Sequence, residues 1–400
     1  MKNTTITAPK GFLAAGISCG IKTSGKKDLC IIACPTGATA AGVFTTNKVV
    51  SAAVILCKKH IKGSIIEAVV VNSGNANTCT GKTGFKNAQI MCKTTAQLID
   101  TKADKVLVAS TGIIGHQLPM EKVSRGIILA GAQLSNSTKA GNDFAQAIMT
   151  TDTRCKQAFT TVNIDSVKIT IAGTIKGAGM IGPNMATTLC FITTDIAISK
   201  PLLQKALADA VGNSLNKLTV DGHQSTNDTA IILASGLADN KPIVKTGTQY
   251  KKFAAALSEL CTDLAKQMVL DAEGATRMFT VIVNGAASKA DAAKAARAIA
   301  NYDLIKCAIH GGDPNWGRII CAVGDCGAKL ILNKLSCSIG NSIVFKNGQP
   351  AKFDPKKVSK IIKQKEHTVT INLGAGKHSA FCYGCDLSAE YVRINADYHT

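Results

Sequence analysis

Residues 177–195 read GAGMIGPNMATTLCFITTD, and this stretch decides between two fold classes. Its first six residues match G-x-G-x-x-G, which in a dinucleotide-binding fold leads into a helix whose N-terminus holds a pyrophosphate. Here Pro183 and Asn184 follow the last glycine, and residues 187–194 are mostly β-branched, aromatic or aliphatic, which favours a strand. Because the required helix is missing, we reject a dinucleotide site.

A glycine-rich loop that runs into a threonine can instead carry a nucleophile. If the Thr187 hydroxyl attacks the carbonyl of Ala186, the amide becomes an ester that water can cut, and Thr187 becomes a new N-terminus. Its α-amine has a reference pKa of about 8 and can act as the base for its own hydroxyl. The residues alone permit this chemistry without requiring it, because β-propensity also explains a threonine at the start of a strand.

Composition and charge exclude several protein classes. The chain has 400 residues, 46% of them hydrophobic, so it can bury a large core, and its length favours two or three domains. The net charge is +20, but the basic residues are scattered doublets and aromatics make up only 4%, which argues against nucleic-acid binding. No apolar run reaches the roughly 18 residues of a membrane span, and residues 1–12 lack the apolar core of a secretory signal. We therefore expect a cytoplasmic protein without membrane contact.

Fifteen cysteines are spread along the chain, many in apolar segments where a reduced thiol behaves as a small hydrophobic side chain. One pair, Cys382 and Cys385, has metal-ligand spacing, but neither a second such pair nor a histidine pair accompanies it. A structural zinc site needs four ligands, so we expect structural thiols and no metal.

Apolar runs alternate with helix-like patterns through the first three-quarters of the chain. The patterns predict strands at 68–71, 106–109, 167–171 and 187–194, and helices at 85–100, 201–211, 253–270 and 288–300. The last eighty residues are β-rich, with a hairpin signal at Asn347-Gly348 and apolar alternation over 368–373. The sequence thus predicts an α/β (α+β) protein with mixed sheets and a smaller β-rich C-terminal domain at roughly 280–400.

The stretch from Lys176 to Thr187, KGAGMIGPNMAT, resembles the self-processing site of the ornithine acetyltransferase family, also called glutamate N-acetyltransferases. Other segments similar to family motifs occur on both sides of it, in the order in which the family has them: 41–47, 72–77, 110–115, 151–153, 271–276, 311–318 and 395–400. The resemblance therefore covers essentially the whole chain. It implies the layered helices and mixed sheets of that self-processing family.

The resemblance implies that the precursor cuts itself between Ala186 and Thr187. Residues 1–186 would form an α chain with the main α/β domain, the oxyanion hole and the processing loop. Residues 187–400 would form a β chain with the nucleophile strand, a helical middle region and the C-terminal domain. The two chains would stay together, as an α2β2 assembly.

The reaction implied by the resemblance is a ping-pong acetyl transfer in arginine biosynthesis. N2-acetyl-L-ornithine gives its acetyl group to Thr187, ornithine leaves, and L-glutamate takes the acetyl group to become N-acetyl-L-glutamate. No metal or cofactor is implied. The sequence leaves open whether acetyl-CoA also serves as a co-substrate that acetylates glutamate.

Site residues follow from the resemblance by motif match. The Thr111 hydroxyl and the Gly112 N–H form the oxyanion hole, which fits their place at the end of a predicted strand. Lys176 suits a carboxylate and Glu273 an ammonium, although either residue taken alone is more often a solvated surface charge. The full set of implied substrate contacts is Thr153, Lys176, Thr187, Glu273, Asn395 and Thr400.

One segment departs from the family pattern. In DGHQSTND, residues 221–228, His223 and Gln224 replace smaller or acidic residues. Thr187 already supplies its own base, so we assign no role to His223, His310 or Trp316.

Two rival hypotheses stay open. The first is a self-processing N-terminal-threonine amidase or aminopeptidase that passes the acyl group to water. The second is a basic nucleic-acid-binding protein whose chain stays intact.

Overall fold

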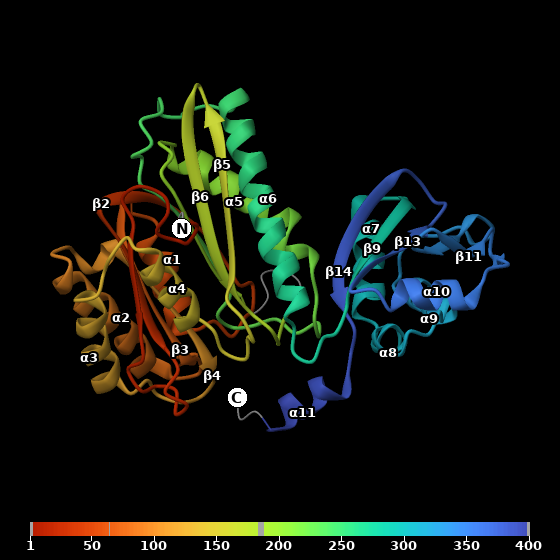
Figure 1. Cartoon of the computed structure of the whole chain (residues 1–400), viewed down its shortest axis with the longest axis horizontal. Coiled ribbons are helices and arrows are strands. Elements are labelled where there is room, and N and C mark those ends of the chain that lie inside the picture. Colours follow the sequence, from red (N-terminus) through yellow and green to blue (C-terminus); the bar gives the residue numbers. More distant parts are fainter. Residues whose placement is uncertain (1–2, 64, 183–187, 398–400) are drawn as a thin grey trace.

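The computed structural model describes residues 3–63, 65–182 and 188–397, and it contains two β-sheets with helices packed on them (Figure 1). The strands of the first sheet are β1 (Leu13–Ile17), β2 (Leu29–Phe44), β3 (Ile66–Asn75), β4 (Val106–Ile113), β5 (Lys156–Ile164), β6 (Val167–Lys176), β7 (Leu189–Thr194) and β8 (Thr229–Ala234). The helices that accompany them are α1 (Ala52–His60), α2 (Gly81–Leu98), α3 (Met120–Gly131), α4 (Thr138–Ala147), α5 (Lys200–Asn213) and α6 (Thr248–Leu270).

The second sheet belongs to the C-terminal part of the chain. Its strands are β9 (Met278–Ala286), β10 (Ser336–Ile339), β11 (Ser342–Lys346), β12 (Gln349–Pro350), β13 (Glu366–Asn372) and β14 (His378–Cys385). The helices of this part are α7 (Lys289–Asn301), α8 (Asp303–Gly311), α9 (Trp316–Asp325), α10 (Pro355–Ile362) and α11 (Ala389–Asp397).

Both sheets are mixed, as the sequence predicts. The first has the order β4-β3-β2-β8-β7-β6-β5, with β1 paired to β2, and the second has the order β12-β11-β10-β13-β9-β14. β3 and β4 are parallel, as are β7 and β8, whereas β5, β6 and β7 are antiparallel. The predicted α/β class with layered helices and mixed sheets is confirmed.

The strand β2 connects the two halves of the first sheet. Its residues 29–33 pair with β1 and β3, whereas residues 39–44 pair with β8. Between these stretches the register shifts around Gly37, which has φ +78°, a conformation that glycine adopts without strain. Such an irregularity bends a strand, so one long strand can serve both halves.

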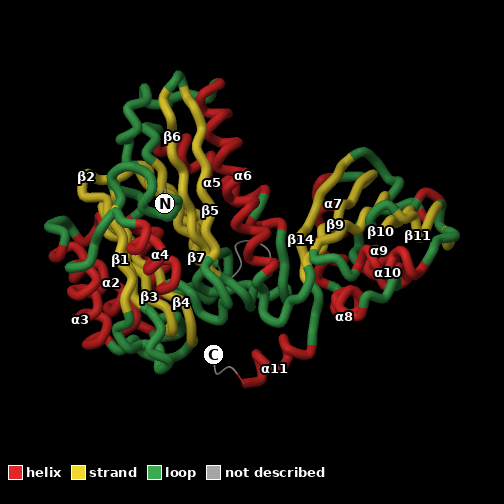
Figure 2. The backbone as a smooth tube through the Cα atoms, viewed as in Figure 1, coloured by secondary structure: helices red, strands yellow, loops and turns green. Residues whose placement is uncertain are grey.

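Alternate residues of β3 face different cores, which shows how the halves are layered. Val69 and Val71 belong to a core that also contains Phe191 of β7, whereas Val70 belongs to a core with Met91 of α2. The outer face of β6 to β8 packs against α5 and α6 in a third core. Helices therefore cover the outside of two sheet halves that face each other (Figure 2).

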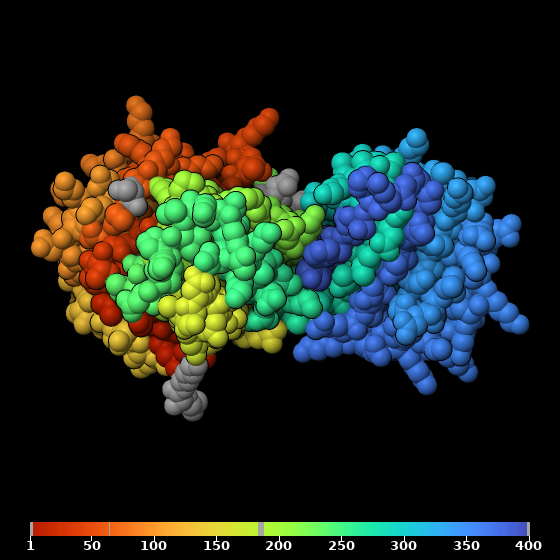
Figure 3. All heavy atoms as spheres, turned by 90° about the horizontal axis from the view of Figure 1, so that it is seen from above, coloured from red at the N-terminus to blue at the C-terminus, as the bar shows by residue number. Residues whose placement is uncertain are grey.

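The first sheet and its helices form the first lobe, and the second sheet and its helices form the C-terminal lobe. The two lobes are distinct in outline (Figure 3). The core of the C-terminal lobe includes residues of β9, β13 and α7. The side chain of Ser288, the N-cap of α7, accepts the Asp291 N–H at 3.0 Å. Helices α7 to α10 accompany the strands of this part of the chain. Helix α11 then returns toward the first lobe (Figure 1). No helix within the described ranges has the length and apolarity to cross a membrane.

Candidate active site

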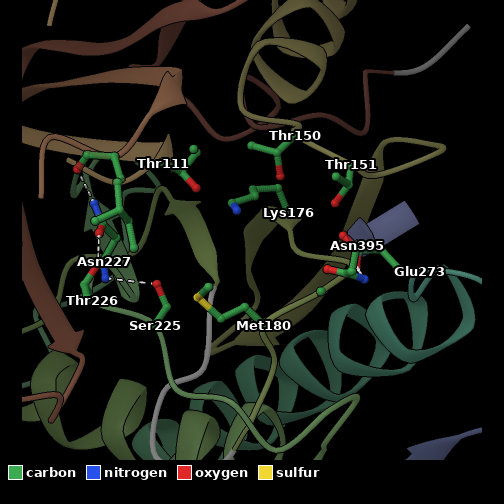
Figure 4. Close-up of a pocket in the computed structure, with 14 residues that line it drawn as sticks. Thr111, Thr150, Thr151, Lys176, Met180, Ser225, Thr226, Asn227, Glu273 and Asn395 are labelled. Carbon is green, nitrogen blue, oxygen red and sulfur yellow. Dashed lines mark hydrogen bonds between the residues drawn. The ribbon is translucent and has the colours of Figure 1, made fainter. Parts of the chain in front are cut away.

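A cavity lies where the ends of strands of the first sheet meet the returning C-terminal helix (Figure 4). Segments far apart in the sequence contribute to it: the ends of β3, β4 and β6, the loops before β5 and β8, the turn after α6, and α11. The lining residues are Ala76, Thr111, Gly112, Ile114, Thr150, Thr151, Lys176, Gly179, Met180, Ser225, Thr226, Asn227, Glu273 and Asn395.

Thr111 and Gly112 form one wall of the cavity. Thr111 is buried, and its hydroxyl faces the cavity without a hydrogen-bond partner among the described residues (Figure 4). Gly112 has φ +131°, and a Cβ there would lie 2.3 Å from the carbonyl carbon of Gly74. Only glycine therefore fits where β4 passes β3, and the unpaired Thr111 hydroxyl beside it suits an oxyanion.

Asn227 binds the backbone next to Thr111 through its side-chain amide. Its side-chain Nδ2 donates to the carbonyl oxygen of Ala76 at 2.7 Å and to that of Ser110 at 2.8 Å. The Thr78 hydroxyl donates to its Oδ1 at 2.7 Å. The buried amide thus links the ends of β3 and β4 and fixes the peptide that precedes Thr111.

Lys176 supplies the positive charge of the cavity. It ends β6 and is only 2% exposed, yet its Nζ has no hydrogen-bond partner within the described part of the chain. Burial lowers the pKa of this ammonium, and the Asp152 carboxylate most strongly opposes that shift. A ligand carboxylate would give the ammonium a partner that the described residues do not provide.

Glu273 and Asn395 form the opposite wall. The Asn395 Nδ2 donates to the Glu273 carboxylate at 2.8 Å, and the Glu273 N–H donates to the carbonyl oxygen of Ala178 at 2.9 Å. The carboxylate lies against Gly179, where a Cβ would come within 2.2 Å of it. These contacts hold a negative charge on the side of the cavity away from Thr111 (Figure 4).

A buried ion cluster supports the floor beside Lys176. The Lys156 ammonium is completely buried and lies 2.5 Å from carboxylate oxygens of both Asp152 and Asp271. Burial raises the pKa of Asp152, but Lys156, Lys176 and the Gly177 N–H lower it more, so the net shift is downward. Because each member has a partner, the cluster fixes the start of the loop after β6.

Thr153 lies apart from the other predicted contacts. It is exposed, and its hydroxyl donates to the carboxylate of Asp271. Its neighbours Thr150 and Thr151 line the cavity instead. The assignment of Thr153 to substrate contact stays a prediction.

Ala186, Thr187 and Thr400 lie outside the described residues. The ends of the segment that contains the first two are described, because Lys176 of β6 pairs with Leu189 of β7. The segment 177–188 therefore leaves and re-enters the sheet at the same edge, next to the cavity. Its last residue, Thr188, donates its backbone N–H to Asp228 at 2.8 Å.

The residues left without a role have structural surroundings. The imidazole of His223 is exposed, and that of His310 lies 2.8 Å from the carboxylate of Asp386. Trp316 packs against Phe345. Cys382 and Cys385 are buried free thiols, and the described residues contain no cluster of three or more metal-ligating side chains. That these two cysteines are structural thiols stays a prediction.

Asn227, Ser225 and Thr226 are cavity residues that sequence reasoning missed. They lie in the segment 221–228, in which His223 and Gln224 depart from the family pattern. Ser-Thr-Asn is also ordinary turn chemistry, so the local pattern gave no reason to choose them.

Comparisons with known proteins show which family this chain resembles. The ArgJ family model matches residues 13–400. The chain is 44% identical to the arginine biosynthesis bifunctional protein ArgJ of Symbiobacterium thermophilum, over 99% of this chain and 98% of the relative. It is 46% identical to the protein of the same name from Dehalococcoides mccartyi, over 99% of this chain and 97% of the relative.

A solved structure is also similar. The crystal structure of the arginine biosynthesis bifunctional protein ArgJ from Bacillus halodurans is 39% identical, with a TM-score of 0.51. The match covers 52% of this chain and 98% of the crystallised chain.

Proposed function

The chain belongs to the ArgJ family, and we propose that it transfers the acetyl group of N2-acetyl-L-ornithine to L-glutamate. It is an acyltransferase of arginine biosynthesis, a glutamate N-acetyltransferase. The acetyl group passes through an ester on Thr187, which becomes the N-terminus of a β chain when the precursor cuts itself after Ala186.

One observation carries this proposal: a single cavity unites Thr111, Gly112, Lys176, Glu273 and Asn395. These five positions were named from the sequence as oxyanion-hole and substrate residues, and they come from four separate stretches of the chain. Lys176 lines the cavity and pairs with Leu189, so β6 ends and β7 begins beside the cavity. The segment that contains the proposed nucleophile is attached to the sheet at these two points.

The cavity supports both half-reactions with the same groups. The Thr187 hydroxyl attacks the acetyl carbonyl and gives its proton to the Thr187 α-amine, while the Thr111 hydroxyl and the Gly112 N–H stabilise the oxyanion. The amine then returns the proton to the departing nitrogen of ornithine. Glutamate repeats the steps in reverse, with its amine as the attacking group.

The charges at the two ends of the cavity suit the α-amino-acid substrates. Lys176 binds the α-carboxylate that both substrates carry, and Glu273, held by Asn395, binds an ammonium group. The part of each substrate near the acetyl group then lies by Thr111, at the other wall. This arrangement gives one site that holds donor and acceptor in turn.

Two features support the self-cleavage. The crystallised relative is matched over 98% of its length by 52% of this chain, so that crystallised chain is about half as long as this one. A cut after residue 186 would also divide one sheet between two chains, because β7 pairs with β6 and β8 pairs with β2. Two long strand ladders would hold the chains together after the cut, in an α2β2 assembly.

Other parts of the proposal rest on the family alone. The enzyme works in the cytoplasm and needs no metal or cofactor. Relatives are named bifunctional, and acetyl-CoA is proposed as a second acetyl donor to glutamate.

Product analysis tests the proposed transfer. Enzyme given N-acetylornithine with a labelled acetyl group, together with glutamate, is expected to place the label on glutamate. A hydrolase with the same nucleophile would release labelled acetate alone, and that outcome would contradict acetyl transfer.

A further inference from the structure

Asp228 is a buried carboxyl group with an unfilled hydrogen-bond position. It immediately precedes β8 and is completely buried. Its Oδ1 accepts the Thr188 N–H at 2.8 Å, whereas its Oδ2 has no hydrogen-bond partner among the described residues. An unpaired buried polar atom costs free energy, so it is rare unless a further group binds there.

Chain connectivity places Asp228 next to the proposed nucleophile. The Thr188 nitrogen is bonded to the carbonyl carbon of Thr187, and only that carbon and Cα separate it from the Thr187 nitrogen. Standard bond lengths limit the distance between the two nitrogens to about 4 Å. A carboxyl group that binds the Thr188 N–H is thus within reach of the nitrogen that the cut would release.

We propose that Asp228 is the partner of the Thr187 nitrogen, giving it a proton during self-cleavage and then holding the resulting ammonium. This role rests on the proposed function of Thr187. It would give Oδ2 the partner that the described residues do not supply.

The protons balance in this scheme. The Thr187 Oγ forms a bond to the Ala186 carbonyl carbon, and the bond from that carbon to the Thr187 nitrogen breaks. The nitrogen receives one proton from the Thr187 hydroxyl and one from the Asp228 carboxyl, so an ammonium faces a carboxylate. Water then hydrolyses the ester, which restores the Thr187 hydroxyl and frees the Ala186 carboxyl group, whose proton is released to solvent.

The surroundings of Asp228 favour a protonated carboxyl before the cut. Burial raises its pKa well above the usual value, while the Thr188 N–H and the Lys176 ammonium act in the opposite direction. Lys176, on β6, is the charged group that acts on Asp228 within the described part of the chain. On the side of β2, the Thr45 N–H binds the backbone carbonyl of Asp228. A new ammonium beside the carboxyl would lower its pKa and ionise it.

The test compares two isosteric variants: one at Asp228, beside the start of β7, and one at Asp195, directly after its end. Asp228→Asn keeps an oxygen for the Thr188 N–H but removes the acidic proton. The matched control is Asp195→Asn, because Asp195 is also buried and its Oδ1 accepts the Thr170 N–H at 2.8 Å. We expect self-cleavage, followed by intact mass, to slow about a hundredfold in Asp228→Asn and to keep its rate in Asp195→Asn.

The cut form of Asp228→Asn gives a second readout that a purely structural role would not change. Without the carboxylate, the Thr187 ammonium loses its stabilising partner, so its pKa falls. The acidic limb of the rate of Thr187 acetylation should therefore move to lower pH by about one unit or more. Equal cleavage rates and superimposable pH profiles for Asp228→Asn and wild type would overturn the proposal. If wild type itself stays uncut, it is the proposed function that fails.

A spectroscopic measurement avoids any change at Asp228. Isotope-edited infrared spectra of labelled aspartates should show a buried protonated carboxyl in uncut Thr187→Ala protein and its loss in cut wild type. The same carboxyl band in both proteins would contradict the proposal, even if Asp228→Asn does not fold.

Discussion

At the residue scale, the buried Thr111 hydroxyl has no hydrogen-bond partner among the described residues, and it lies next to a glycine that no other residue can replace. Such a donor is poised for charge that develops only during reaction. Because self-cleavage and acetyl transfer both pass through a tetrahedral oxyanion, one defect here should affect both.

Thr111→Val removes the hydroxyl and keeps the shape of the side chain. We expect the rates of self-cleavage and of acetyl transfer each to fall by about two to three powers of ten. Intact mass against time and initial rates measure the two effects. Thr160→Val on β5, away from the cavity, is the control and should match wild type; an unchanged rate in Thr111→Val would remove Thr111 from the oxyanion hole.

Glu273→Gln separates substrate binding from the chemistry of the cut. The amide still accepts the Asn395 N–H but carries no charge for an ammonium, so the KM for N-acetylornithine should rise about tenfold or more. Self-cleavage involves no substrate and should keep its rate. Steady-state kinetics and intact mass check this split, with the exposed Glu259→Gln on α6 as control. Slower cleavage with an unchanged KM would contradict the assignment.

Individual site residues could be predicted only through resemblance. Lys176 and Glu273 have the local sequence of surface charges, yet both are buried in the structure. Asn227 and Asp228 read as turn residues, because their partners Ser110 and Thr188 are far away in the sequence. Their roles depend on tertiary contacts that no local pattern contains.

At the element scale, β13 brings an imidazole into the core of the C-terminal lobe. His367 is 7% exposed, stacks on Phe279, and has no hydrogen-bond partner for either ring nitrogen among the described residues. Burial, and secondarily Arg277, lower its pKa from 6.5 to about 4, while Asp386 opposes the shift. The folded state therefore favours the neutral ring.

This depressed pKa predicts acid sensitivity with a definite sign. Between pH 6.5 and 4 the unfolded chain binds a proton at His367 that the folded chain does not, so stability is full above this window and falls as the pH falls. At pH 4 the loss amounts to about 3 kcal/mol. Thermal unfolding of wild type and His367→Leu across this window measures the difference.

The variant should lose less stability on acidification than wild type does. Other carboxyl groups also titrate in acid, which is why the difference between the two proteins is the relevant quantity. Parallel stability curves would show that His367 is already satisfied in the folded state.

Helix α11 carries Asn395 to the cavity, and its Tyr391 hydroxyl donates to Asp221 at 3.2 Å. The predicted contact Thr400 follows α11 and lies outside the described residues. A tag fused after Thr400 should therefore lower acetyl-transfer activity, whereas a tag at the N-terminus should not. Full activity of the C-terminally tagged protein, beside an untagged sample, would count against a role for the chain end.

Elements with strong periodicity could be predicted, and irregular ones could not. Predicted strands correspond to β3, β4, β6 and β7, and predicted helices to α2, α5, α6 and α7. The hairpin at Asn347-Gly348 is also confirmed, with Lys346 paired to Gln349. The double role of β2 escaped prediction, because it depends on pairing with both β3 and β8.

At the scale of the whole molecule, the proposed cut falls inside one sheet rather than between lobes. β6 would end the α chain's part of the sheet, and β7 would begin the β chain's part beside it. The proposed break would therefore free a nucleophile without separating the walls of its cavity. The mixed α/β class could be predicted from patterning, but this interleaving of the two chains could not.

Intact-mass analysis of freshly purified protein tests the central claim, that a cut after Ala186 creates the nucleophile. Wild type is predicted to give two chains, residues 1–186 and 187–400, with the second gaining one acetyl group when N-acetylornithine is added. Thr187→Ala is predicted to remain a single chain of 400 residues that gains none. A wild-type protein that stays in one piece and still transfers acetyl groups at full rate would contradict the claim.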